Sequence, residues 1–227
     1  MPVRRESLFF IAFVSLCLVP SLSGSPESDE LINFKSSLEN NVVLASWNNS
    51  ALPCDGSRPN WVGVLCLNGT VYGLQLEHMG LSGTIDVNSL HRLPYLRSLS
   101  LMDNNFEGGF PNFNILGKLK ALYLSNNMFS GDIPDDAFRR MSSLKVLFLA
   151  NNQFTGTIPS SLTTLPKLAE LKLEGNQFHG EIPPFRQEDI KVNVASNELV
   201  GQIPASLSKL NPSSFAGKRS FKLFVLH

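Results

Sequence analysis

Apolar residues recur along most of the chain as pairs in the pattern L-x-L, and each pair is followed by x-x-N-x-(F/L)-x-G-x-I-P. Successive copies are LSLMDNNFEGGFP from Leu99, LYLSNNMFSGDIP from Leu122, LFLANNQFTGTIP from Leu147 and LKLEGNQFHGEIP from Leu171. A fainter copy, VNVASNELVGQIP, begins at Val192, and a degenerate first copy, LQLEHMGLSGTID, begins at Leu74. Because strand side chains alternate between two faces, both leucines of each L-x-L point into a core and the residue between them points outward.

The asparagines of the pattern give its period. They are Asn104, Asn127, Asn152, Asn176 and Asn197, so the steps are 23, 25, 24 and 21 residues. This spacing is typical of leucine-rich repeats. The sequence therefore predicts an α/β solenoid of about six repeats with parallel strands on an inner, concave face. Leucines such as Leu162, Leu165 and Leu168 predict short helical or 3₁₀ segments on the outer side, and the asparagines should turn inward to pair with backbone groups.

Four segments follow from this pattern: 1–24 as a secretory signal peptide, 25–70 as an N-terminal cap, 71–210 as the repeats and 211–227 as a divergent tail. In the cap, Ser28 is expected to begin a helix that places Leu31, Phe34 and Leu38 on one face. Trp47 and Trp61 are expected to pack as an apolar plug over the first repeat. A terminal repeat needs such a cover because it would otherwise expose its core leucines.

Residues 1–24 have the features of a cleaved leader. Arg4 and Arg5 precede an apolar run from Leu8 to Val19, and small residues follow, so we expect cleavage between Ser23 and Ser25. The alternative, a transmembrane anchor, is weaker because the run is shorter than the ~20 residues that span a bilayer. No later stretch is longer, so we expect a secreted, apoplastic chain with no membrane span after processing.

Two of the three cysteines remain once the leader is removed. Cys17 lies in the leader, and Cys54 and Cys66 are expected to form a disulfide in an oxidising compartment. A zinc site would need two further ligands and the histidines are scattered, so we expect no metal and no cofactor. The sequons at Asn48 and Asn68 are predicted N-glycosylation sites.

Charge and motifs exclude further classes of function. Lys and Arg together number 19, as do Asp and Glu. Loss of the leader leaves 17 basic and 18 acidic residues. Such a balance argues against a nucleic-acid binder, which concentrates basic residues. No G-x-S-x-G, H-E-x-x-H or phosphate-binding glycine loop is present, so we expect no catalytic site in this chain.

Variable positions of the inner face are the predicted binding residues. Tyr123, Phe148 and Lys172 are the central residues of consecutive L-x-L segments and should stand side by side at the ~4.8 Å spacing of neighbouring strands. Two exposed aromatic rings beside Glu170 and Glu174 resemble the composition of binding hot spots. A second possible location lies nearer the C-terminal repeats, at Lys191, Asn193 and the loop Phe185–Asp189. The fifth repeat is shorter than the others at this loop. The loop either contacts a partner or is only a shortened outer segment of the repeat.

The chain resembles the ectodomains of plant leucine-rich-repeat receptor kinases in two features. One is the I-P ending of its repeats, and the other is the cap sequence Trp47…Cys54…Trp61-Val62-Gly63-Val64-Leu65-Cys66. The segment GEIPPFRQEDIKVNVASNELVGQIPASLSKLNPSSFAG, from Gly180 to Gly217, is similar to the end of the ectodomain in pollen receptor-like kinases. The resemblance covers residues 25–217.

This resemblance implies a cell-surface receptor that binds a secreted peptide, a small protein or a co-receptor kinase and signals in pollen tube growth or guidance. It ends at Gly217, before the membrane helix and kinase domain of the family, so we expect a truncated product that lacks kinase activity. A full-length product would lie in the plasma membrane. The alternatives are a soluble decoy and a secreted enzyme inhibitor; the latter class has paired cysteines at both ends, which disfavours it here.

Overall fold

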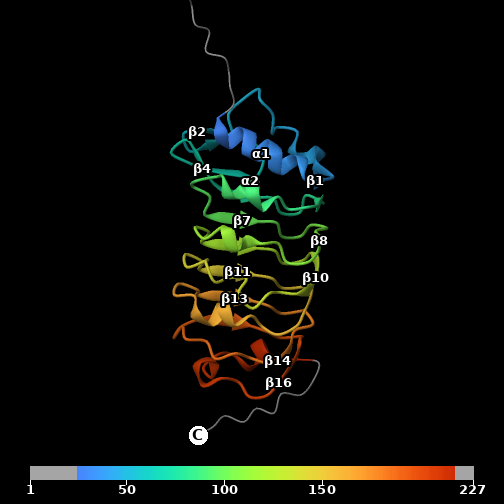
Figure 1. Cartoon of the computed structure of the whole chain (residues 1–227), viewed down its shortest axis with the longest axis vertical. Helices are drawn as coiled ribbons and strands as arrows, with labels where there is room; N and C mark the ends of the chain where they lie inside the picture. Colours follow the sequence, from blue (N-terminus) through green and yellow to red (C-terminus); the bar gives the residue numbers. More distant parts are fainter. Residues whose placement is uncertain (1–24, 218–227) are drawn as a thin grey trace, which may run out of the picture.

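The computed structural model describes residues 25–217, so the predicted leader and the residues after Gly217 lie outside it. Figure 1 shows an elongated stack of coils, one repeat to a coil, with α1 at one end. A seven-stranded sheet runs along the stack in the order β15-β13-β11-β9-β7-β5-β4. Its strands are β4 (Val64–Leu67), β5 (Thr70–Gln75), β7 (Ser98–Ser100), β9 (Ala121–Tyr123), β11 (Val146–Phe148), β13 (Glu170–Lys172) and β15 (Lys191–Asn193). The predicted solenoid with parallel inner strands is confirmed.

The leucines of the L-x-L segments stack in register through this sheet. Leu99 pairs with Leu122, Leu122 with Leu147 and Leu147 with Leu171. All four are fully buried, as are the second leucines of these segments. Burial of each such side chain contributes about 1.5–3 kcal/mol relative to exposure. The apolar pairs therefore form one continuous core along the stack.

Buried asparagines join consecutive coils, as predicted. Asn127 Nδ2 donates to the carbonyl of Leu124 in its own coil (3.1 Å) and to that of Leu101 in the preceding coil (2.9 Å). Its Oδ1 accepts the backbone N–H of Phe106 (3.1 Å). Asn104, Asn152, Asn176 and Asn197 repeat this arrangement. Each amide thus satisfies polar groups that the turn would otherwise leave unpaired.

A second set of short parallel strands, which we did not predict, lies after the asparagines. It comprises β8 (Glu107–Gly108), β10 (Met128–Asp132) and β12 (Gln153–Thr155) in one sheet and β14 (His179–Glu181) and β16 (Glu198–Val200) in another. One phenylalanine packs in each of the four coils that carry β8, β10, β12 and β14, and Leu199 takes this place in the coil of β16. Phe106, Phe129, Phe154 and Phe178 are stacked at ring-centroid distances of 6.2, 6.0 and 6.3 Å. We call these four residues the phenylalanine stack.

The outer side consists of short helical segments, as predicted. They are α2 (Val87–His91) and the 3₁₀ helices η2 (Phe113–Ile115), η3 (Ser160–Thr164) and η4 (Ala205–Leu207). Asp135 joins its own coil to the next one. Its carboxylate accepts the backbone N–H of Ser160 and bonds to the Ser160 hydroxyl, both at 2.6 Å. These bonds hold the pKa of Asp135 below its usual value.

The cap covers the first coil with a helix, α1 (Pro26–Ser36). Ser25, and not Ser28, is its N-cap: Ser25 Oγ accepts the N–H of Ser28, while Ser28 itself is buried. Leu31 and Phe34 are fully buried as predicted, but Leu38 lies beyond the helix, in β1. The remaining cap elements are β1 (Leu38–Glu39), which pairs with β6 (Ser82–Gly83), η1 (Asn41–Leu44), β2 (Cys54–Asp55) and β3 (Arg58–Pro59).

The predicted aromatic plug and disulfide are both present in the cap. Trp47 and Trp61 stack at a centroid distance of 5.8 Å, and each indole N–H donates to a backbone carbonyl. Cys54 and Cys66 are bonded. The bridge ties β2 to β4, so it fastens the cap to the edge of the seven-stranded sheet.

Residues 211–217 continue the stack, although their sequence leaves the repeat pattern. The backbone N–H groups of Val194 and Ser196 donate to the carbonyls of Ser214 (2.8 Å) and Ala216 (2.6 Å). Phe215, in η5 (Pro212–Phe215), is buried against the last coil. This segment therefore covers part of the C-terminal end of the core.

The irregular fifth repeat packs in a similar way. Phe185 and Ile190 are buried where other coils place leucines, and Gln187 Nε2 donates to the carbonyls of Leu162 (3.1 Å) and Leu165 (2.7 Å). The Phe185–Gln187 part of the loop thus packs on the outer side, against η3 and the residues after it. It does not join the inner-face residues.

Candidate functional site

The inner-face row predicted from the L-x-L segments is assembled by strand register. Tyr123 pairs with Phe148, Phe148 with Lys172 and Lys172 with Asn193 across β9, β11, β13 and β15. Each side chain points outward because the leucines on either side of it point into the core. The seven-stranded sheet therefore presents these four side chains as one contiguous strip, which we call the inner-face row.

Contacts within the row hold its side chains in place. The rings of Tyr123 and Phe148 meet edge to face at a centroid distance of 5.0 Å. Lys172 Nζ lies 4.1 Å from the centre of the Phe148 ring and 3.8 Å from Glu170 Oε1. Both aromatic residues are half-buried, not exposed as we expected, because each ring covers part of its neighbour. The Lys172 ammonium lies against one face of Phe148, and cation–π contacts of this kind contribute ~0.5–1 kcal/mol at exposed sites.

The carboxylates beside the row differ in environment. Burial raises the pKa of Glu174 above its usual value; Lys172 and Asn193 oppose this only in part, and one buried oxygen, Oε2, has no hydrogen-bond partner within residues 25–217. Burial, followed by the charges of Glu170 and Glu77, also raises the pKa of the Tyr123 hydroxyl. A carboxylate with one unpaired buried oxygen, that of Glu174, therefore stands beside the row.

Replacing Glu174 with glutamine should make stability less dependent on pH. A carboxyl whose pKa is raised on folding stabilises the fold most below its unfolded pKa, and this contribution is lost as pH rises through the folded pKa. Glu174→Gln should therefore gain stability relative to the native protein between acidic and neutral pH. Melting temperatures measured from pH 3.5 to 7.5 test this. Glu198→Gln, which removes one carboxylate at an exposed position, is the control. An equal change of melting temperature with pH in both variants would contradict the prediction.

Lys191 and Asn193 of the second predicted location, but not its loop Phe185–Asp189, meet the first location at the C-terminal end of the row. A hollow of about 260 Å³ is lined by Glu170, Lys172, Lys191 and Asn193. Leu210, Asn211 and Ser214 complete its wall, and sequence reasoning missed all three because they lie outside the repeat pattern. The order of the repeats, which places each coil directly on the last, therefore joins Glu170 and Lys172 to Lys191 and Asn193 in one site.

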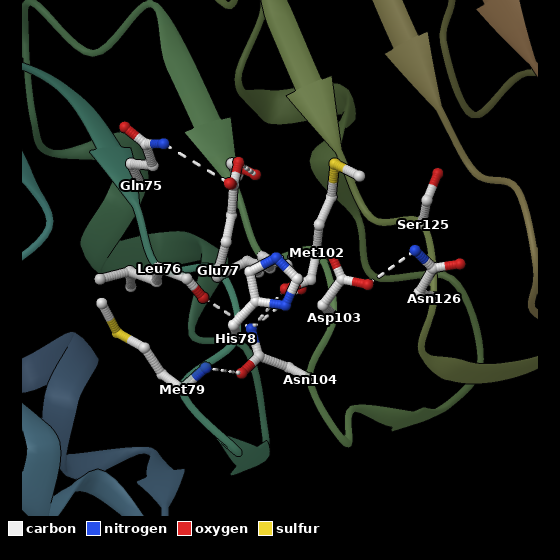
Figure 2. A network of polar contacts seen from close by, with 12 residues as sticks. Gln75, Leu76, Glu77, His78, Met79, Met102, Asp103, Asn104, Ser125 and Asn126 are labelled. Carbon is white, nitrogen blue, oxygen red and sulfur yellow. Dashed lines mark hydrogen bonds and ion pairs between the residues drawn. The ribbon is translucent and has the colours of Figure 1, made fainter.

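Polar residues at the other end of the same face were also not singled out. Glu77 and Ser100 form a hydrogen bond of 2.5 Å, and Gln75 lies beside Glu77 in Figure 2. Glu77 is the residue after the second leucine of its L-x-L, the position that Glu174 occupies in the fifth repeat. This shared position in the repeat is the feature of the sequence that could have pointed to Glu77.

A row of left-handed residues follows the inner strands and carries a chain of side-chain bonds. His78 Nε2 lies 3.3 Å from Asp103, Asn126 donates to Asp103 (2.7 Å) and Asn151 donates to Asn126 (2.8 Å). Figure 2 shows the first part of this chain. Gly175 follows with φ +70°, and the Asn151 side chain leaves no space there for a Cβ atom. These bonds fix the backbone at the end of the inner strands of consecutive coils.

Several other expected features can be placed. Asn48 and Asn68 are exposed in the cap; their glycosylation stays a prediction. Within residues 25–217 no three His, Cys, Asp or Glu side chains cluster to hold a metal ion. None of the helices in the same range combines the length and apolar character needed to cross a bilayer.

Comparison with known proteins identifies the architecture. The leucine rich repeat N-terminal domain matches residues 25–67, and the leucine rich repeat matches residues 117–178. Pollen receptor-like kinase 4 of Arabidopsis thaliana is 48% identical over 218 residues, which is 91% of this chain and 32% of that protein. The crystal structure of Pollen Receptor Kinase 3 is 40% identical and covers 82% of this chain and 91% of its own, with a TM-score of 0.72. The chain belongs to the pollen receptor-like kinase family.

The match locates the described residues within that family. They correspond to the extracellular leucine-rich-repeat ectodomain of these plant cell-surface receptor kinases, and the chain spans about a third of the length of the relatives it matches. The ectodomain of the Arabidopsis receptor kinase HAESA is a further structural neighbour. It is 31% identical, covers 81% of this chain and 31% of its own, and has a TM-score of 0.72; it was solved with the peptide hormone IDA and the co-receptor SERK1.

Proposed function

We propose that this pollen receptor-like kinase ectodomain binds a secreted peptide or small protein on its inner face and assembles with a co-receptor kinase. The observation that supports this most is the contiguous inner-face row, whose two aromatic rings and Lys172 stand beside Glu170 and Glu174. The HAESA complex, which contains a peptide hormone and a co-receptor on the same type of solenoid, supports it independently. The ligand signals in pollen tube growth or guidance.

The chemistry of the row defines what it binds. Tyr123 and Phe148 offer apolar area that is already ordered by their mutual contact, so little side-chain entropy is lost on binding. The Glu174 oxygen without a partner accepts a hydrogen bond or a cation from the ligand, and the hollow beside Lys191 and Asn193 receives a polar end group. An extended ligand that lies across β9 to β15 reaches all of these groups.

Phe148→Ala is expected to weaken ligand binding by about 30-fold or more, the range of a hot-spot aromatic residue. The ectodomain, displayed with its disulfide intact, would be screened against a panel of synthetic secreted plant peptides and small cysteine-rich proteins, and affinities measured by biolayer interferometry. Val200→Ala, which trims an exposed apolar side chain on β16, is the control and should leave affinity unchanged. Equal binding by the two variants would place the ligand elsewhere on the solenoid.

A further inference from the structure

A lateral face of the solenoid carries a column of basic residues immediately before the inner strands. Arg97, Lys120 and Lys145 precede β7, β9 and β11, and their backbones are stacked: Lys120 N–H donates to the Arg97 carbonyl (2.7 Å) and Lys145 N–H to the Lys120 carbonyl (2.8 Å). Consecutive cations therefore recur at about the ~4.8 Å spacing of neighbouring strands. Figure 1 shows the uninterrupted stacking of these coils.

A second column lies two residues earlier in each coil. Tyr95, Lys118 and Lys167 occupy this position, with Ser143 between the last two. Arg140 is exposed and lines the same hollow as Lys118, and the exposed Arg139 precedes it in the chain. Six of these cations form no ion pair within residues 25–217: Lys118, Lys120, Arg139, Arg140, Lys145 and Lys167. We call these two columns with the two arginines the basic columns.

The distribution of charge shows that the basic columns are not a result of overall composition. The chain has equal numbers of basic and acidic residues. Four of its acidic residues, Glu107, Asp132, Glu181 and Glu198, lie on the second set of strands, while Asp135 and Asp136 are in the turn that precedes Arg139 and Arg140. An extended positive potential on one side of a neutral protein attracts a polyanion of matching length.

A hollow of about 380 Å³ adjoins the columns. His91, Lys118 and Arg140 contribute to its rim, and the turns around Leu96 and Leu119 form its apolar wall. Tyr95 follows Pro94, which lines this hollow. The Tyr95 side chain is 53% exposed, and Tyr95 is the most exposed aromatic residue of the described chain. An exposed aromatic face beside cations suits a sugar ring, which has apolar C–H surfaces, together with an attached carboxylate.

We propose that the basic columns bind a linear uronate polysaccharide, with its carboxylates on the lysines and a sugar ring on Tyr95. An extended uronate chain carries one carboxylate on each ring, and the columns carry one cation on each of several consecutive coils. The line of charges favours an extended chain over the flat surface of a membrane. The hollow beside Lys118 shares no lining residue with the inner-face row.

The proposal is tested by binding of the secreted protein to unesterified oligogalacturonate and to the same oligosaccharide with its carboxylates methyl-esterified. The unesterified form should bind and weaken steeply with salt, while the neutral ester should not bind. Lys120→Gln with Lys145→Gln should lower affinity about tenfold or more, since each lost charge-assisted contact is strong. Tyr95→Ala should lower affinity and leave the salt dependence unchanged.

Arg58→Gln with Lys209→Gln removes the same charge at exposed positions away from the basic columns and is the matched control. It should bind as the native protein does. Melting temperatures of all variants establish that the fold is retained. The proposal is overturned if the oligosaccharide does not bind, if the ester binds equally, if the control double variant loses as much affinity, or if the protein binds phosphatidylserine vesicles in preference to the oligosaccharide.

Discussion

Phe154→Ala is expected to lower the free energy of unfolding by about 4 kcal/mol, the range seen when a large buried aromatic side chain is removed. Phe154 lies in the middle of the phenylalanine stack, 6.0 Å from Phe129 and 6.3 Å from Phe178 between ring centroids, and is fully buried. Phe110 also meets its ring, at 6.1 Å. The alanine variant leaves a cavity that contacts three coils, and the backbone hydrogen bonds between those coils prevent it from closing.

Urea unfolding followed by circular dichroism measures this effect. Fluorescence of Trp47 and Trp61 in the same experiment reports whether the distant cap unfolds together with the repeats. Met128→Ala is the control, because it trims a side chain on β10 that is 41% exposed; a change of about 0.5 kcal/mol is expected there. A Phe154→Ala loss of less than about 1 kcal/mol, the centre of the distribution for point mutations, would show that the stack is not a core element.

Asn152→Ala is expected to lower the free energy of unfolding by about 3 kcal/mol, because it removes the acceptor of a buried N–H and one of two donors from each of two buried carbonyls. The Phe129 N–H loses its acceptor at 3.1 Å. The carbonyls of Leu124 and Leu149 lose the Asn152 amide at 3.0 and 3.1 Å and keep only the amides of Asn127 and Asn176. Asn152→Asp separates the two losses: it keeps the acceptor for Phe129 but places a charged oxygen against the carbonyls. That variant should be at least as unstable as the alanine variant near neutral pH.

Asn105 provides the matched control for this experiment. It is an asparagine of the same repeat pattern, but it is exposed and its only side-chain bond within residues 25–217 is a long one of 3.4 Å to Gly80. Asn105→Ala should change stability by about 0.5 kcal/mol or less. If Asn105→Ala and Asn152→Ala were equally destabilising, the loss would reflect helix and strand preferences and not the bonds between coils.

Much of the fold could be predicted because one coil of this solenoid is stabilised by residues that recur in every other coil. The inward direction of Leu122 and Leu147, and the bonds of Asn127, follow from strand geometry and from the need to pair backbone groups. The disulfide between Cys54 and Cys66 followed from cysteine number and compartment. The register of Tyr123, Phe148 and Lys172 followed from equal spacing, since stacked strands of equal length must pair in order.

Features that depend on tertiary contacts could not be predicted. Two-residue strands such as β8 have no alternation to recognise, so the second set of strands was missed. Ser25 caps α1 because Pro26 follows it, which favours the start of a helix at that point. Phe185 and Gln187 pack against the preceding coil on its outer side, which no local pattern indicates. The half-burial of Tyr123 likewise arises from a neighbour 25 residues later in the chain, Phe148.

The buried asparagines also determine how such a protein can change in length. Asn152 bonds to its own coil and to the one before it, so every coil supplies half of the partners for its neighbour. A gene rearrangement that adds or removes one whole repeat, joined at equivalent positions, leaves each amide with a full set of partners. Shorter insertions within L-x-L-x-x-N displace the amide from those partners and are confined to the outer turns. Binding surfaces of this kind therefore evolve by steps of a complete repeat, while new loops accumulate on the side away from the inner strands.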